Sequence, residues 1–225
     1  MSSDTRAVPS GSQRGLDLEV VPFGQLQIAF DRHVLRPRDW TTAQASWAAE
    51  LLDGLPPGRV LELCAGAGHI GLLAVADNER SLVSVDIDPI ATAFAAGNSL
   101  AAGLASRVQV REGSLDAVLG DDERFALIIA DPPWVRRSHV AHFPEDPLLA
   151  IDGGADGLQV ARRCVTVAEK HLCPGGTTLL QLGSLAQAAQ ISDFISRHDR
   201  LRISEIRNFP HQGVLVRLDP TEAVR

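Results

Sequence analysis

The residues best suited to chemistry follow an apolar run at Phe125–Ala130, where the chain reads Asp131-Pro132-Pro133-Trp134. Two prolines remove two backbone donors, so a neighbouring carbonyl such as that of Pro132 is a candidate hydrogen-bond acceptor for a ligand. With the Asp131 carboxylate, this carbonyl could hold both hydrogens of an NH2 group, while Trp134 stacks on the plane of that group. Asp131, Pro132 and Trp134 are therefore predicted to be catalytic. The alternative interpretation is a Pro-Pro turn that ends a strand beside a buried tryptophan.

A nitrogen held in this way is a demanding methyl acceptor, because its lone pair is delocalised into a carbonyl group or an aromatic ring. A site that fixes the nitrogen in line with the departing sulfur supplies proximity and stabilises the positive charge that shifts onto nitrogen. Such a transfer needs no nucleophilic side chain. The pattern therefore favours methyl transfer to a planar amide or amino nitrogen.

A glycine-rich turn marks the expected site of the methyl donor. An expected strand runs into a turn that contains Gly66, Gly68 and Gly71, where the backbone can approach a ligand beyond the carboxyl end of the strand. Asp86 ends the next expected strand, where an acid can accept hydrogen bonds from both hydroxyls of a ribose. These glycines also have the spacing of dinucleotide-binding loops, so they do not separate S-adenosylmethionine from a nicotinamide cofactor.

Glu62 is the residue that separates the two cofactors. A carboxylate beside this turn would repel a pyrophosphate and attract the cationic methionine end of S-adenosylmethionine. After the third expected strand, Ser114 offers a hydrogen bond and Leu115 an apolar face to an adenine, although Ser114 could equally be a helix N-cap. We therefore predict S-adenosylmethionine as the cofactor, bound by residues of these loops: Glu62, Cys64, Ala65, Gly66, Gly68, Asp86, Ile87, Ser114, Leu115 and Asp131.

The elements that must position these residues alternate short apolar runs with helical stretches, which predicts parallel strands joined by crossover helices. The expected parallel strands are Arg59–Leu63, Leu82–Val85, Val108–Arg111, Ala126–Ala130 and Thr177–Leu182. The expected helices are Ile70–Ala76, Pro89–Ala102, Leu158–Leu172 and Leu185–Ser196. Two further strands, Leu201–Phe209 and Gly213–Leu218, are separated only by a turn, so they are expected to be antiparallel. The predicted fold is α/β, a Rossmann-like class I methyltransferase fold with a mostly parallel seven-stranded sheet, an antiparallel C-terminal strand pair and helices on both faces.

The chain is expected to form one domain, because its 225 residues match the usual size of a single large domain. Residues 1–15 are polar and are predicted to be a disordered tail without the apolar segment of a signal peptide. Residues 16–57 are predicted to form a hairpin and an entry helix, with Thr41 or Thr42 as the N-cap. Residues 58–225 are the predicted methyltransferase core.

Charge and composition narrow the expected partners. The net charge of -7 argues against a surface that follows phosphate backbones, so nucleic acid is the less favoured substrate. The spacing of Cys64, Cys164 and Cys173 indicates small buried side chains, without a disulfide framework or a zinc site. His139 and His142 have no third ligand at a suitable spacing, so no metal is expected. No apolar run has the length of a membrane span, and a cytoplasmic protein is therefore predicted.

The chain resembles the HemK-like protein-glutamine methyltransferases, which methylate the side-chain amide of a Gly-Gly-Gln glutamine in peptide release factors. The resemblance covers roughly residues 18–218, and its most specific part is Glu145–Leu158, which is similar to the family's Glu-Pro…Ala-Leu-Asp-Gly-Gly-x-Asp-Gly segment. The other matching positions are Val34-Leu35-Arg36-Pro37-Arg38, Glu62–Gly68, Asp86, Asn98 and Asp131–Trp134. The resemblance implies a Rossmann-like fold, S-adenosylmethionine as cofactor and methylation of a nitrogen.

Several positions depart from the family's pattern. The family's catalytic Asn is Asp131 here and its Tyr is Trp134, a form more similar to enzymes that act on exocyclic amino groups of nucleic-acid bases. In the cofactor loop, the family's Asp and first Gly are Glu62 and Cys64, and its Glu-rich segment after Pro-Arg becomes Asp39–Thr42. The family's N-terminal helical domain is expected to be missing. A protein glutamine or a small molecule is the favoured acceptor, a nucleic-acid base is the alternative, and a catalytically idle cofactor-binding module is the third hypothesis.

Overall fold

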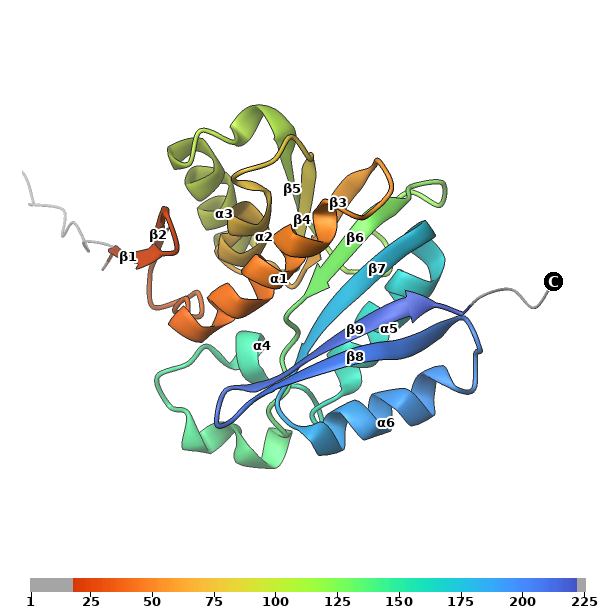
Figure 1. The fold of residues 1–225 in the computed structure, drawn as a ribbon. Helices are drawn as coiled ribbons and strands as arrows, with labels where there is room; N and C mark the ends of the chain where they lie inside the picture. Colours follow the sequence, from red (N-terminus) through yellow and green to blue (C-terminus); the bar gives the residue numbers. More distant parts are fainter. Residues whose placement is uncertain (1–17, 222–225) are drawn as a thin grey trace, which may run out of the picture.

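The computed structural model describes residues 18–221, whose arrangement is shown in Figure 1. The tail predicted for residues 1–15 lies outside the described residues. The described chain begins with an antiparallel hairpin of β1 (Glu19–Phe23) and β2 (Leu26–Phe30). None of the helices in the described part of the chain is both long and apolar enough to cross a membrane.

The main sheet has seven strands in the order β5-β4-β3-β6-β7-β9-β8. Strands β3 to β7 pair in parallel, and β9 lies between β7 and β8, antiparallel to both. The strands are β3 Arg59–Leu63, β4 Leu82–Asp86, β5 Val108–Glu112, β6 Phe125–Ala130, β7 Leu172–Leu182, β8 Leu201–Phe209 and β9 Gly213–Pro220. The predicted mostly parallel sheet with an antiparallel C-terminal pair is therefore confirmed.

Strand β7 begins earlier than predicted, at Leu172 instead of Thr177. Leu172 pairs with Phe125, and regular pairing resumes at Thr177 and Leu127 after a shift in register. Gly175, with φ +76, lies within this irregular stretch. The sequence around Pro174 therefore reads as a loop, although the backbone already lies along the sheet.

The helices are α1 Thr42–Leu52, α2 His69–Val75, α3 Pro89–Ala101, α4 Leu148–Ile151, α5 Gln159–His171 and α6 Leu185–Ile195. Short 3-10 turns occur at η1 Asp39–Thr41, η2 Ala105–Arg107 and η3 Arg137–His142. Helix α1 begins after Thr41, as predicted, but the Thr41 hydroxyl donates to the Arg38 carbonyl at 2.8 Å and makes no capping bond to the helix. The reason is that η1 already supplies the first turn. Helix α4 was not predicted.

Helices cover both faces of the sheet (Figure 1). One hydrophobic core joins the hairpin, α1, α2 and α3 to the sheet, and a second core joins α5 and α6 to the opposite face. Strand β6 contributes to both, because Leu127 and Ile129 point into the first core while Phe125 and Ile128 point into the second. Burial on two faces explains the continuous apolar run of β6, which carries Asp131 at its carboxyl end.

Asn98 on α3 fixes the hairpin to the glycine-rich turn. Its side-chain oxygen accepts a hydrogen bond from the Ala29 backbone amide at 2.8 Å, and its nitrogen donates to the carbonyls of Ala29 and Ala67, both at 2.9 Å. Asn98 is buried, so loss of these three bonds would leave backbone groups without partners. The hairpin is therefore a fixed part of the structure around the site.

Candidate active site

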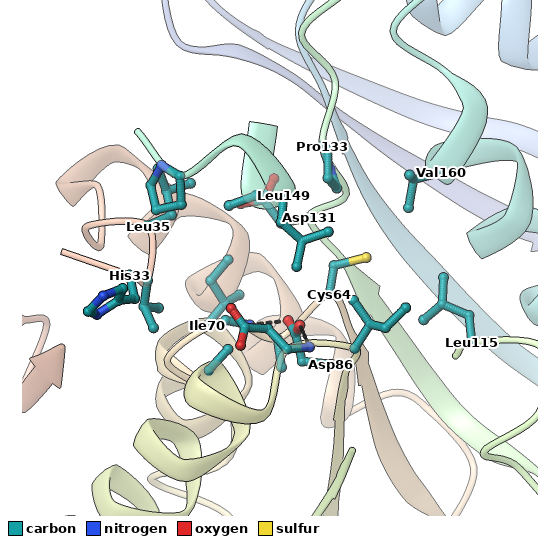
Figure 2. A pocket seen from close by; sticks show the side chains of 18 of the residues that line it. His33, Leu35, Cys64, Ile70, Asp86, Leu115, Asp131, Pro133, Leu149 and Val160 are labelled. Carbon is teal, nitrogen blue, oxygen red and sulfur yellow. Dashed lines mark hydrogen bonds between the residues drawn. The ribbon is translucent and has the colours of Figure 1, made fainter. Parts of the chain in front are cut away.

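The predicted loops converge at the carboxyl ends of β3, β4, β5 and β6, where they surround one cavity (Figure 2). Asp86 lies near the middle of this cavity, with Asp131 and Pro133 above it in the view. Leu115 and Val160 lie toward the right, and His33 lies at the left edge. The cavity thus has an apolar end, an acidic centre and an end formed by the N-terminal segment.

The glycine-rich turn lies on the wall of the cavity. Gly66 has φ +54, and a Cβ built there would meet nothing within 4 Å, so the left-handed backbone and not a lack of space favours glycine. At Gly68 a Cβ would lie 3.0 Å from the Ala95 Cβ of α3. A larger residue there would limit how closely α2, which begins after Gly68, could pack on α3. Gly66 therefore presents backbone to a ligand, while Gly68 serves the packing behind it.

Cys64 departs from the glycine that the family has at this position. Its φ of 57 lies in the left-handed region, which carries a conformational penalty of about 1–3 kcal/mol for a non-glycine residue. The side chain lines the cavity, and contact with the Cys164 thiol together with burial raises the pKa of Cys64. Cys64 is consequently a neutral thiol at neutral pH, and it is half-buried where the sequence predicted a buried side chain.

Asp86 lies at the end of β4 and holds the glycine-rich turn. One carboxylate oxygen accepts from the Gly66 backbone amide at 2.8 Å, and the other accepts from the Asp88 amide at 3.0 Å. Burial raises the pKa of Asp86, although these hydrogen bonds oppose the change. Each carboxylate oxygen can accept a second hydrogen bond, so Asp86 retains acceptor capacity toward the cavity. Binding of a ribose there remains a prediction.

Glu62 does not line the cavity, so its predicted attraction for the cationic end of the cofactor stays a prediction. The residue is only 2% exposed, and its carboxylate accepts from the Gly71 amide at 2.7 Å and the Ser84 hydroxyl at 2.8 Å. A Cβ at Gly71 would lie 2.5 Å from this carboxylate, so the glycine makes room for it. Burial raises the pKa of Glu62 to about 7. Glu62 therefore acts from behind the turn.

The apolar end of the cavity includes two residues of α5 that sequence reasoning missed. Val160 and Arg163 both line the cavity beside Ser114 and Leu115. Arg163 donates to the Ser114 hydroxyl at 2.8 Å and pairs with Asp116 at 2.6 Å. Ser114 therefore begins a turn instead of capping a helix. The spacing of three between Val160 and Arg163 on an amphipathic helix is the signal that could have identified them.

Asp131 lies on the cavity wall with no hydrogen-bond donor from the described residues. Burial raises the pKa of Asp131 to about 7, and no hydrogen bond from the described part of the chain opposes this change. At Asp86, in contrast, backbone hydrogen bonds oppose the effect of burial on the pKa. A half-buried carboxyl group without a partner is expensive to desolvate, so its presence beside a cavity points to a ligand that supplies donors. The sequence predicted Asp131 as a catalytic residue, but it did not predict this raised pKa.

The remaining residues of the predicted catalytic loop lie differently. Pro132 is buried behind the wall, and no described residue donates a hydrogen bond to its carbonyl, so this oxygen stays a candidate acceptor. Pro133, not Trp134, lines the cavity. The Trp134 ring is half-buried against Gly183 at the end of β7. Stacking of Trp134 on an acceptor therefore remains a prediction.

The N-terminal segment contributes His33, Val34 and Leu35 to the cavity. Val34 and Leu35 are among the positions that match the family, whereas His33 had no signal in the sequence. The His33 ring lies 3.1 Å from the buried Asp31 carboxylate. Arg38, at the end of this segment, pairs with Asp146 at 2.6 Å. This ion pair joins the N-terminal segment to the loop before α4. That loop supplies Pro147 to the same cavity, and α4 supplies Leu149 and Ala150.

His69 is a further cavity residue that the analysis of the glycine spacing passed over. Burial lowers the pKa of His69 to about 4, so its ring is neutral at neutral pH. Its Nδ1 is buried without a partner among the described residues, and its ring packs edge-on against Phe23 at 4.8 Å between centroids. His139 and His142 instead lie exposed on η3, with ring centroids 5.5 Å apart.

Most of the predicted cofactor residues are brought together. Those on the cavity wall are Cys64, Ala65, Gly66, Asp86, Ile87, Ser114, Leu115 and Asp131. The predicted cofactor residues Glu62 and Gly68 lie behind the wall or beside it, as do the predicted catalytic residues Pro132 and Trp134. Among residues 18–221 no group of three or more His, Cys, Asp or Glu side chains could hold a metal ion.

Comparisons with known proteins show the family and the fold of this chain. Residues 46–191 match the family described as "Methyltransferase small domain". The ribosomal protein uL3 glutamine methyltransferase of Bradyrhizobium diazoefficiens is 42% identical over 130 residues, which are 56% of this chain and 40% of that protein. The protein of the same name from Bordetella pertussis is 32% identical over 209 residues, 80% of this chain and 67% of that protein.

Among solved structures, the ribosomal protein L11 methylase from Lactobacillus delbrueckii subsp. bulgaricus has the same fold, with a TM-score of 0.61. The two are 16% identical, and the match covers 85% of this chain and 84% of that one. The chain spans 40% of the length of the first glutamine methyltransferase and 67% of the second. The chain therefore belongs to the methyltransferase small domain family, as the resemblance to the HemK-like enzymes predicted.

Proposed function

We propose that the protein binds S-adenosylmethionine in this cavity and transfers its methyl group to a planar amide or amino nitrogen. The favoured acceptor is the side-chain amide of a protein glutamine. The observation that carries the proposal is the Asp131 carboxyl group, which lies on the cavity wall without a donor among the described residues. Its position on the same wall as Asp86 and the glycine-rich turn joins an acceptor site to a cofactor site.

The residues around the cavity fit S-adenosylmethionine. Asp86 and Asp131 line it, Glu62 lies behind it, and burial raises the pKa of all three, so the site favours a cationic ligand that stabilises their ionised forms. Leu115 and Val160 form the apolar end that suits an adenine. When bound, the cofactor supplies an electrophilic methyl group on a positively charged sulfur.

Asp131 has two roles in the proposed transfer. Its ionised carboxylate accepts a hydrogen bond from the acceptor N–H and stabilises the positive charge that develops as the nitrogen–carbon bond forms and the carbon–sulfur bond breaks. The methylated nitrogen then loses one proton. With its pKa raised to about 7, Asp131 is matched to take up that proton near neutral pH.

The glutamine acceptor rests on the relatives. Two proteins named ribosomal protein uL3 glutamine methyltransferase are 42% and 32% identical to this chain over their matched parts. Another, from Clostridium acetobutylicum, is named release factor glutamine methyltransferase and is 27% identical over 205 residues. Because these names concern a ribosomal protein and a release factor, we keep the cytoplasm as the proposed location.

The test begins with cofactor binding and continues with methyl transfer. Isothermal titration should give saturable binding of S-adenosylmethionine, and NAD under the same conditions should not bind. Labelled cofactor is then offered with purified uL3, with a release factor and with RNA. Label in a glutamine of either protein supports the proposal. Binding without transfer to any acceptor, including fractionated extract, would favour the idle cofactor-binding module.

One observation favours the nucleic-acid alternative. The sequence Asp131–Trp134 is more similar to the form found in enzymes that methylate exocyclic amino groups of bases. The net charge of -7 opposes it, because backbone binding usually needs a basic surface. Label entering RNA with a strong dependence on salt, and none entering protein, would overturn the glutamine assignment and retain the nitrogen chemistry.

A further inference from the structure

The glycine-rich segment Asp152–Gly157 belongs to Glu145–Leu158, the most specific part of the resemblance, and none of Asp152–Gly157 lines the cavity. It lies instead along the chain that follows Trp134. Val135 donates to the Ile151 carbonyl at 3.0 Å, and Gly153 donates back to the Val135 carbonyl at 2.8 Å. The segment therefore pairs with the chain directly after the predicted catalytic loop.

Three glycines allow this loop to be held from two sides. A Cβ at Gly153 would lie 2.7 Å from the Pro133 carbonyl oxygen, and one at Gly157 would lie 2.5 Å from the Trp134 carbonyl oxygen. On the other side, a Cβ at Gly183 would overlap the six-membered ring of Trp134. No larger residue fits at these positions without moving the loop.

Gln187, in the first turn of α6, links the three segments. Its Nε2 donates to the Trp134 carbonyl at 2.9 Å and to the Gly157 carbonyl at 3.4 Å, and its Oε1 accepts from the Gly183 amide at 2.8 Å. The residue is 7% exposed. A single buried amide thus joins the loop after β6, the segment before α5 and the end of β7.

We propose that Gln187, together with Gly183, is a positioning residue that fixes the Trp134 ring and the adjoining Asp131 relative to the methyl acceptor. The proposal rests on the proposed function. None of the three hydrogen bonds of the Gln187 side chain goes to a residue that lines the cavity. Its loss therefore acts on the acceptor side of the site and leaves cofactor binding intact.

The test compares Gln187→Met with Gln190→Met. Gln190 lies on the same helix but is only partly buried, and its side chain bonds within the helix to the Ala186 carbonyl. Gln187→Met keeps the side-chain length and removes all three bonds. We expect kcat/KM for the acceptor to fall by about 100-fold, the size typical of a misplaced reacting group, while the Kd for S-adenosylmethionine changes less than about twofold. Gln190→Met should match the wild type.

Gln187→Glu separates the two halves of the link, because a carboxylate still accepts from the Gly183 amide but cannot donate to the Trp134 carbonyl. It should lose activity like Gln187→Met. Hydrogen exchange should accelerate in residues 131–137 of both variants and not in Gln190→Met. This readout does not depend on catalysis.

Three outcomes are distinguishable. A wild-type protein that binds no S-adenosylmethionine and methylates no acceptor overturns the proposed function itself. An active wild type with unchanged acceptor kinetics in Gln187→Met overturns only the positioning role. A fall in cofactor affinity equal to the fall in kcat/KM would mean that Gln187 supports the whole fold, which also contradicts the proposal.

Discussion

The cofactor side and the acceptor side of the cavity are built in different ways. On the cofactor side, Asp86 holds the Gly66 amide and Glu62 holds the Gly71 amide, so neighbouring strand ends and one turn complete the structure. On the acceptor side, the loop after Asp131 depends on Gln187 and on Asp152–Gly157, which come from distant parts of the chain. The glycine-rich turn of the first side is therefore a local motif, whereas the loop of the second side is a product of tertiary packing.

The carboxyl groups of the two sides differ in the same sense. Burial raises the pKa of Asp86 and of Asp131, but Asp86 accepts two backbone hydrogen bonds and no described residue donates to Asp131. Asp86 is thus already part of the protein's hydrogen-bond network. Asp131 has its carboxylate oxygens free to accept hydrogen bonds from a ligand. Methyl transfer should therefore depend more on Asp131 than on Asp86.

The largest expected effect is the loss of Asp131. In Asp131→Ala, methyl transfer should fall by about 10²–10³-fold, because the group that stabilises developing charge is removed, while cofactor affinity falls far less. Asp131→Asn tests whether the charge or only the hydrogen-bond acceptor is needed. Steady-state kinetics on the identified acceptor measure both, with Asp193→Ala on the exposed face of α6 as the control. Wild-type rates in both variants would remove Asp131 from the mechanism.

Next in size is the pH dependence that Glu62 confers on stability. Because burial raises the pKa of Glu62 to about 7 from an unfolded value near 4.5, the fold favours the protonated form. Its contribution to stability is present below the unfolded pKa and is lost as pH rises through about 7. Glu62→Gln should therefore gain stability relative to the wild type between pH 5 and 8, by about 3 kcal/mol at most.

Urea unfolding of wild type and Glu62→Gln at several pH values measures this difference. Gln retains an oxygen that accepts from the Gly71 amide, so packing is matched. A difference in unfolding free energy that stays constant with pH would show that Glu62 titrates normally. That result would also weaken the contrast between the cofactor side and the acceptor side. It would show that burial does not raise the pKa of the carboxyl group behind the glycine-rich turn.

Asp86→Ala should weaken S-adenosylmethionine binding by about 1.5–3 kcal/mol, the usual size for hydrogen bonds to a charged group. The same change frees the Gly66 amide, so the melting temperature should also fall. Isothermal titration of the folded variant measures the affinity, with Asp193→Ala as a control because Asp193 is exposed on α6 and does not line the cavity. Unchanged affinity would remove Asp86 from the cofactor site.

The smallest effect is expected at the ion pair between Arg38 and Asp146. Arg38 is 40% exposed, so Asp146→Asn should lower the free energy of unfolding by only about 0.5–1 kcal/mol. Chemical unfolding in low and high salt measures it, because screening should shrink the difference. A loss well above this range would mean that this ion pair stabilises the contact between the N-terminal segment and the loop before α4 more than an exposed pair usually does.

The sheet, and the meeting of several predicted site residues at one edge of it, could be predicted from the amino-acid sequence. Alternation of apolar and helical segments predicts parallel strands, and the ends of neighbouring parallel strands meet at one edge. The glycine-rich turn, Asp86 and Leu115 could therefore be placed together without coordinates. The reason is that each lies directly at the end of a strand, so chain connectivity alone brings it to the cavity.

The directions of side chains on irregular segments, or on strands buried on both faces, depend on tertiary packing and could not be predicted. Strand β3 is buried on both faces, so its pattern could not show that Glu62 points toward α2 and away from the cavity. Likewise, the direction of Trp134 depends on Gly183 and Gln187, which lie about fifty residues further along the chain. Such contacts have no local signature, because they exist only after distant segments have packed together.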